Sequence, residues 1–146
     1  MKCVIQRVRS ASVRIGDELV SSIGPGLLIL GAVEKGDGEP EMRAAARKIR
    51  ELRIFSDTAG KMNRDVSEAG GSMLAVSQFT LAGSIDRGRR PSFDGAETPE
   101  RARELFELFC DELGAGGVAV ERGRFREEMI VALENDGPVT FVYEGR

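Results

Sequence analysis

Apolar residues in the first part of the chain follow patterns that are typical of β-strands. Residues 3–15 alternate loosely between apolar and polar positions, and residues 27–33 form a short continuous apolar run. A run of this length suits a central strand that is buried on both faces. Glycine-containing turns at 16–18 and 24–26 separate the apolar segments. The pattern therefore predicts neighbouring strands joined by tight turns.

Two later segments have the spacing of amphipathic helices. In residues 39–51, apolar side chains recur at near-helical intervals between arginines and glutamates, which predicts a first helix. A second helix is predicted to begin after Thr98, because threonine is a good N-cap and Pro99 fits the first helical position. Its apolar stripe continues to the glycines at 114–117, where we expect the helix to end.

Shorter segments complete the prediction. We expect a short strand at 53–55, a turn at 56–61, irregular chain at 63–71 and a strand at 72–81. Further short strands are expected at 118–120, 129–133 and 139–143, with a turn at 135–138. The fold class that follows is α+β: a mixed, largely antiparallel sheet that carries two helices, in a single domain over residues 1–146.

The composition is that of an ordinary globular protein, with 41% hydrophobic and 31% charged residues. Charged residues follow soon after the first methionine, which argues against a signal peptide. No apolar run approaches the roughly 18–20 residues of a membrane span. We therefore expect a cytoplasmic protein with no membrane partner. Cys3 and Cys110 form no metal or redox motif, and we expect them to be buried free thiols.

Charge and the missing histidine limit the possible chemistry. The chain contains no histidine, which excludes Ser-His-Asp and Cys-His hydrolases and zinc sites built on histidine. A net charge of −3 argues against wrapping a long duplex. Arg87, Arg89 and Arg90 nevertheless form a basic patch in the long loop at 82–97, where they are candidates to hold the phosphates of a nucleic-acid end. The alternative is an ordinary solvated loop.

A polar cluster, Ser77-Gln78-Phe79-Thr80, lies at the end of the apolar run that begins near residue 73. On a flat strand, Ser77 would face one side while Gln78 and Thr80 face the other. A bulge or the end of the strand would let the side chains converge and would free backbone N–H groups. Two adjacent free N–H groups are what an oxyanion hole needs. The structural alternative is that the serine and threonine pair across the sheet.

Two further segments are candidates for a site. Asn135-Asp136-Gly137-Pro138 is composed of turn residues, yet proline beside a strand is unusual because it cannot donate to the ladder. Gly123-Arg124-Phe125 places an aromatic residue after a glycine turn, where packing in the core is the simpler role.

Taken together, these segments resemble the D-aminoacyl-tRNA deacylases, the D-tyrosyl-tRNA(Tyr) deacylase family, from end to end of the chain. The most specific features are Ser77-Gln78-Phe79-Thr80 and Gly137-Pro138-Val139-Thr140, in that order. Further matching motifs are Gly60-Lys61-Met62-Asn63, Gly88-Arg89-Arg90-Pro91 and Gly123-Arg124-Phe125. Two departures are Ala82-Gly83, where the family often has a larger residue, and Arg126, where glycine is usual.

The resemblance implies a barrel-like sheet and a homodimer with its site at the subunit interface. Ser77, Gln78, Phe79 and Thr80 of one subunit would be the catalytic segment and would face Gly137 and Pro138 of the other, with that peptide bond cis. The substrate would be the 3′ end of a tRNA esterified to a D-amino acid, with no cofactor, no metal and no DNA partner. Arg7 is expected to brace the Gly137-Pro138 segment, the alternative being an ordinary surface or strand-edge arginine, and the arginines of the basic loop are expected to bind the tRNA. Rejection of L-aminoacyl-tRNA through that segment is steric in this interpretation, so glycyl-tRNA should also be cleaved.

Two mechanisms remain open at this point. In the first, backbone N–H groups around Phe79 and Thr80 stabilise the oxyanion and a ribose hydroxyl of the RNA activates water. In the second, Thr80 is a nucleophile. Two other functions are alternatives: a binding module for RNA ends without turnover, and a general hydrolase of small esters.

Overall fold

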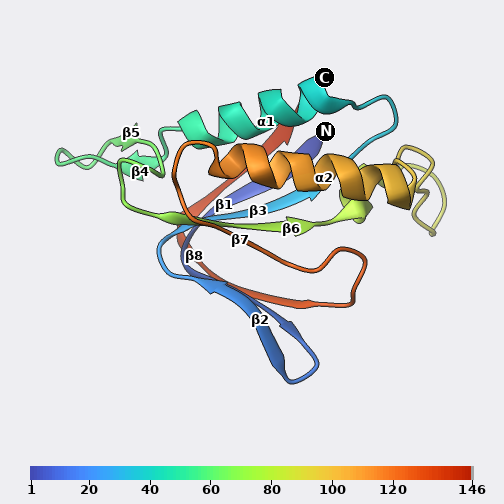
Figure 1. Cartoon of the computed structure of the whole chain (residues 1–146), viewed down its shortest axis with the longest axis horizontal. Coiled ribbons are helices and arrows are strands. Elements are labelled where there is room, and N and C mark those ends of the chain that lie inside the picture. The colour runs from blue at the N-terminus through green and yellow to red at the C-terminus, as the bar shows by residue number, and fades with distance from the viewer. Residues whose placement is uncertain (146) are drawn as a thin grey trace.

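The computed structural model describes residues 1–145 and has a curved six-stranded sheet at its centre (Figure 1). The strands run in the order β2-β1-β3-β6-β7, and β8 pairs with the other edge of β1. Their bounds are β1 Lys2–Ile15, β2 Glu18–Ile23, β3 Gly26–Ala32, β6 Ser72–Ser77, β7 Val120–Arg122 and β8 Ile130–Glu144. β4 (Phe55–Ser56) and β5 (Met62–Arg64) form a separate two-stranded sheet.

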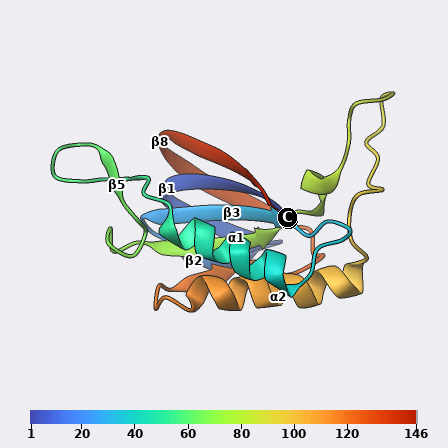
Figure 2. The same cartoon turned by 90° about the horizontal axis from the view of Figure 1, so that it is seen from above.

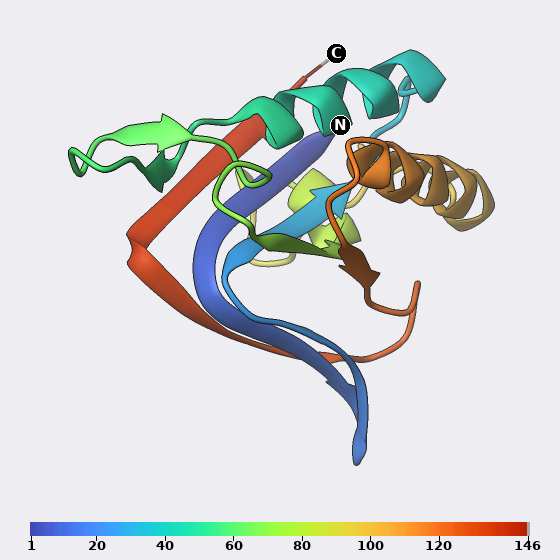
Figure 3. The ribbon, with the colours of Figure 1, turned by 60° about the vertical axis from the view of Figure 1, so that its left-hand side comes forward.

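Pairing within the main sheet is mixed. β1 is antiparallel to β2, β3 and β8, whereas β3, β6 and β7 are parallel to one another. β1 and β8 run side by side over most of their length and bend together, so that the sheet curls into a partly closed barrel (Figure 3). The expected α+β class, with a mixed, barrel-like sheet and two helices, is confirmed.

Helices α1 (Glu39–Glu51) and α2 (Pro99–Gly114) lie side by side over one face of the sheet (Figure 2). Both helices were predicted within one residue of these bounds. α1 begins where the Glu41 carboxylate accepts a hydrogen bond from the Gly38 N–H at 2.7 Å, the acidic half of a capping box. α2 begins with Pro99, whose missing N–H would have no helical partner in the first turn.

The two faces of the sheet bury separate hydrophobic clusters, and β3 contributes to both. Leu27 and Ile29 pack under the helices, in a cluster with α2 residues such as Phe109. Leu28 points to the opposite, concave face, where it joins residues such as Val8. Six of the seven β3 residues are buried, which confirms the expected central strand.

Several boundaries differ from the sequence prediction. The strand expected over 72–81 ends at Ser77, which pairs with Gly31 one residue before the end of β3, and the chain then turns into the 3₁₀ turn over residues 79–82. The expected strand–turn–strand over 129–143 is one strand, β8, because β1 pairs with it on both sides of the expected turn. β4 begins two residues later than expected, β5 lies in a segment expected to be irregular, and β7 lies two residues later than expected.

Both cysteines are buried free thiols, as predicted. Burial raises the pKa of Cys3 and of Cys110 from 9.0 to about 12, since an apolar environment disfavours the thiolate. Cys3 lies on β1 and Cys110 on α2, and both side chains belong to the core between the sheet and the helices. Within residues 1–145, no helix is both long and apolar enough to cross a membrane.

Candidate active site

The polar cluster begins where β6 ends and continues into a single 3₁₀ turn, η1 (Phe79–Ala82). The Gln78 N–H donates to the Gly31 carbonyl at 2.8 Å, which is the last bond between this segment and β3. The next two N–H groups, those of Phe79 and Thr80, have no hydrogen-bond acceptor among the described residues. The first N–H groups of a 3₁₀ turn have no partner within it. Both residues are exposed, so two adjacent backbone donors point away from the ladder.

The side chains of this cluster do not pair across the sheet. The Gln78 amide donates to the Thr80 hydroxyl, two residues along the chain. Phe79 is 58% exposed and stacks at a tilt on Phe93, with 5.1 Å between ring centroids. The structural alternative raised by the sequence was that the serine and threonine side chains pair across the sheet, and neither does so among residues 1–145.

A second segment, Asp136 to Val139, bulges from β8 opposite a single β1 residue, Arg7. The Gly137-Pro138 peptide bond is cis. Gly137 has φ +144°, which favours glycine, and a Cβ there would lie 2.7 Å from the Val139 side chain. Asn135 closes the bulge: its side chain accepts from the Val139 N–H at 2.7 Å and donates to the Val139 carbonyl at 3.2 Å.

Arg7 lies behind this bulge and joins it to the β4–β5 hairpin. Its Nε donates to the Asp136 carbonyl at 2.9 Å, and its Nη1 donates to the Ile54 carbonyl at 2.6 Å. The side chain is half-buried. The arrangement is that of a brace, because one guanidinium with a fixed fork of donors holds two backbone segments at once.

Within one chain the two segments lie far apart. Ser77 and the bulge are on strands separated by β3 and β1, three strand spacings or about 14 Å. Register adds to this separation: Ser77 is level with Gly31 and Cys3, whereas the bulge is level with Arg7, about 13 Å further along β1. The two segments of one chain therefore cannot contact the same few atoms of a ligand.

The basic loop leaves the body of the protein next to the polar cluster. Ser84 and Ser92 exchange backbone hydrogen bonds of 2.7 and 2.9 Å, which closes the loop tip that carries Arg87, Arg89 and Arg90. All three arginines are exposed. The loop between η1 and α2 stands away from the sheet (Figure 2), and the contact between Phe79 and Phe93 ties its base to the cluster.

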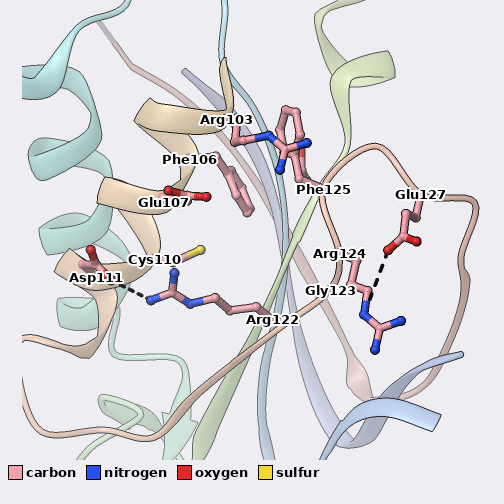
Figure 4. Close-up of a pocket in the computed structure, with 11 residues that line it drawn as sticks. Arg103, Phe106, Glu107, Cys110, Asp111, Arg122, Gly123, Arg124, Phe125 and Glu127 are labelled. Atoms are coloured by element: carbon pink, nitrogen blue, oxygen red, sulfur yellow. Dashed lines mark hydrogen bonds and ion pairs between the residues drawn. The ribbon is translucent and has the colours of Figure 1, made fainter. Parts of the chain in front are cut away.

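A cavity of about 710 Å³ opens beside the polar cluster, between α2 and the segment 122–127 (Figure 4). Ser77 forms part of its wall. Arg122 and Asp111 also line the cavity, and the Arg122 guanidinium donates a hydrogen bond to the Asp111 carboxylate at 2.7 Å. The Arg124 guanidinium donates hydrogen bonds to the carboxylate of Glu18 in the β1–β2 hairpin. These bonds raise the pKa of the Arg124 guanidinium above its ordinary value.

Sequence reasoning identified Gly123-Arg124-Phe125 but missed the α2 side of this cavity. Arg103 and Asp111 belong to the charged face of a helix whose apolar stripe was the visible signal. Phe125 was expected to be a packing residue, and it does pack against the core while also lining the cavity. Among residues 1–145, no three acidic or cysteine side chains are grouped so that they could hold a metal ion.

Comparison with known proteins identifies the family. The family model described as D-Tyr-tRNA(Tyr) deacylase matches residues 4–144. The chain belongs to this family. The resemblance stated from the sequence motifs is thereby confirmed, and with it the enzyme class, the deacylases.

Individual relatives agree with the family assignment. A protein from Pelobacter propionicus, named D-aminoacyl-tRNA deacylase, is 54% identical over 144 residues, which is 99% of both chains. A solved structure titled c-Myc DNA Unwinding Element Binding Protein is 36% identical, with a TM-score of 0.92 over 99% of this chain and 98% of that one. A second, a probable eukaryotic D-amino acid tRNA deacylase, has a TM-score of 0.83 over 97% of both chains at 16% identity, and supports the fold.

In this deacylase, one sequence departure has a structural consequence. Arg126, which the resemblance marks as a departure from glycine, has φ +65°. This is the left-handed region, which costs a residue with a Cβ about 1–2 kcal/mol. The chain therefore keeps an exposed arginine in a backbone conformation that glycine adopts freely.

Proposed function

We propose that this chain hydrolyses the ester of D-aminoacyl-tRNA and releases free tRNA and a free D-amino acid. The observation that carries the proposal is the pair of unpartnered N–H groups of Phe79 and Thr80 at an exposed strand end. Relatives across nearly the whole chain length are named for this activity. An aminoacyl ester is intrinsically labile, so oxyanion stabilisation supplies much of what the reaction needs.

The two N–H groups would bind the carbonyl oxygen as negative charge develops on it during attack by water. One such donor is worth roughly a hundredfold or more in rate. With no histidine in the chain, the base that activates water would be the neighbouring ribose hydroxyl of the substrate. The Thr80 hydroxyl already accepts from Gln78, which leaves it in a positioning role in this scheme.

A homodimer would bring the two distant segments together. β8 pairs only with β1 among the described strands, so its outer edge is open along its length. It also exposes apolar side chains at consecutive positions, Phe141 at 44% and Val142 at 65%. An open, apolar edge strand tends to pair with another chain. We infer that a second copy covers part of β8 and presents its Gly137-Pro138 bulge to the Ser77–Thr80 segment.

This cross-subunit arrangement accounts for chirality by exclusion. The Gly137 and Pro138 carbonyls would occupy the space that an L side chain needs, whereas a D substrate presents only hydrogen there. Thousandfold discrimination requires about 4 kcal/mol, which a steric clash readily supplies. Glycine carries hydrogen at both positions, so glycyl-tRNA should also be hydrolysed.

The RNA would lie along the basic loop. Arg87, Arg89 and Arg90 are exposed on one loop tip beside the cluster, and guanidinium groups bind phosphates in a bidentate manner. A net charge of −3 favours contact with one RNA end over a long DNA duplex. We place the activity in the cytoplasm, where aminoacyl-tRNA is made and used.

The test is ester loss from D-tyrosyl-tRNA, L-tyrosyl-tRNA and glycyl-tRNA, measured with excess substrate and EDTA. We expect many turnovers with the D and glycyl substrates and none above background with the L substrate. Binding without turnover would replace this proposal with an RNA-end binding module. Comparable turnover of a small aryl ester would indicate a general esterase.

A further inference from the structure

The arginines that line the cavity beside Ser77 differ in their charge partners. Arg122 is paired with Asp111 at 2.7 Å, and Arg124 is paired with Glu18. Arg103 has no carboxylate within salt-bridge distance among residues 1–145, although it lines the same cavity. Arg103 is therefore the one of these three cavity arginines that forms no ion pair among residues 1–145, and Glu107, which lines the same cavity, forms none either.

Arg103 is held by an aromatic ring instead. Its guanidinium carbon lies 5.1 Å from the centre of the Phe125 ring (Figure 4). A guanidinium in such a cation–π contact commonly stacks through its flat face. The N–H donors all lie in the plane of the group, so stacking leaves its edge free to donate. The group is thus oriented before any ligand arrives, which reduces the entropy lost when a ligand binds.

The cavity joins Arg103 to the proposed reaction site. Ser77 at the end of β6 and Arg103 on α2 line the same space of about 710 Å³, which is a normal size for a small-ligand site. In an aminoacylated RNA, the ester is on the terminal ribose, and the nearest anion is the phosphate on the other side of that ribose. Because Ser77 and Arg103 line one cavity, a ligand with its ester at residues 77–80 has room to place that phosphate beside Arg103.

We propose that Arg103 is a substrate-binding residue that donates a bidentate pair of hydrogen bonds to the phosphate of the terminal nucleotide, while Phe125 keeps its guanidinium in place. This inference rests on the proposed function, and it assigns to α2 a phosphate contact separate from the basic loop. The contact forms in the ground state and in the transition state alike. It therefore contributes to substrate affinity and leaves the rate of the bound complex unchanged.

The experiment compares three variants by steady-state kinetics on a D-aminoacyl-tRNA. Arg103→Gln removes the charge, and Arg103→Lys keeps the charge but loses the planar fork. Arg101→Gln is the matched control, because Arg101 is an exposed arginine of the same helix that pairs with Glu104 at 3.3 Å. We expect Arg103→Gln to raise KM at least about tenfold while kcat stays within about twofold of the wild type. The KM of Arg103→Lys should lie between those of the wild type and Arg103→Gln. The Arg101→Gln control should match the wild type in both constants.

Two further readouts separate a phosphate contact from a loss of packing. The slope of log(kcat/KM) against log salt should become shallower by roughly 0.7 in Arg103→Gln, the value for one lost phosphate contact on a single strand. In calorimetric titrations, the wild type should bind adenosine 5′-monophosphate more tightly than adenosine. Arg103→Gln should lose that preference while its affinity for adenosine is unchanged.

The outcomes distinguish this inference from the function on which it rests. If the wild type turns over substrate but Arg103→Gln has the KM and salt slope of the wild type, the inference is wrong and the deacylase proposal stands. If the wild type binds the nucleotide through Arg103 but hydrolyses nothing, the proposed function fails and the phosphate site remains. If Arg101→Gln raised KM and changed the salt slope as much as Arg103→Gln does, both effects would reflect general electrostatic attraction. That result would overturn the specific contact of Arg103.

Discussion

Replacement of Arg7 by methionine tests whether the bulge in β8 depends on a brace from β1. Arg7→Met keeps an unbranched apolar stem and removes both hydrogen bonds of the guanidinium, to the Asp136 carbonyl at 2.9 Å and to the Ile54 carbonyl at 2.6 Å. Hydrogen bonds from charged donors contribute about 1.5–3 kcal/mol each, and the half-buried position lowers that value. We expect a loss of about 3 kcal/mol in the free energy of unfolding, measured by urea denaturation.

The same substitution should affect stereochemical selection. Loss of about 1.4 kcal/mol of restraint on the bulge carbonyls corresponds to a tenfold change in a rate ratio. We therefore expect Arg7→Met to hydrolyse L-tyrosyl-tRNA at least about tenfold faster relative to D-tyrosyl-tRNA than the wild type does. The assay is paired measurement of kcat/KM on the two substrates below the unfolding transition.

Arg9 supplies the control for this prediction. It lies two residues along the same strand, its side chain is 75% exposed, and it approaches the Asp136 carboxylate only to 3.7 Å. A pair of this kind contributes at most about 1 kcal/mol, so Arg9→Gln should resemble the wild type in stability and selectivity. A folded Arg7→Met protein with wild-type selectivity would refute the reasoning, because the bulge would then hold its carbonyls without the brace.

Three further predictions concern the turn η1, the cavity rim and the thiols. Thr80→Val should keep turnover within about tenfold of the wild type, since the proposed oxyanion donors are backbone groups; loss of all activity with intact folding would instead indicate a threonine nucleophile. Arg126→Gly should raise stability by about 0.5–1 kcal/mol, seen as a higher Tm, because φ +65° favours glycine; an unchanged or lower Tm would contradict this. Burial raises the pKa of Cys3 and Cys110 from 9.0 to about 12, so the unfolded chain loses these protons first. Stability should fall as the pH rises from about 9 toward 12, and Cys→Ala variants at both positions should weaken that dependence; native thiols that react rapidly at pH 8 would contradict the assigned burial.

Local patterns in the sequence were sufficient for the elements whose stability is largely local. The helix at 39–51 follows from apolar spacing, and the start of α2 follows from Thr98 and Pro99. The double burial of β3 follows from its unbroken apolar run. Each of these features depends on residues within a few positions of one another, so the local sequence is enough to predict it.

The candidate site was only partly visible in this way. The Ser77–Thr80 and Gly137-Pro138 segments stood out by residue type, yet the sequence alone left open whether a strand would split the first of them. The structure gives the answer: the last bond to β3 runs from the Gln78 N–H to the Gly31 carbonyl, and the chain then turns into η1. The prediction that a turn at 135–138 separates two strands was wrong, because β1 pairs with β8 on both sides of the bulge.

The sequence by itself thus determined the helices, the central strand, the free thiols and the family, and it singled out the two candidate segments Ser77–Thr80 and Gly137-Pro138. The tertiary structure decided where strands end and which distant groups meet: Arg7 with carbonyls 47 and 129 residues away, and Arg103 with the Phe125 ring. The physical reason is that propensity and periodicity act over a few residues, whereas ladder partners, cavity walls and charge pairs come from segments far apart in the chain. Their positions follow only once the sheet has curled and the helices have packed on it.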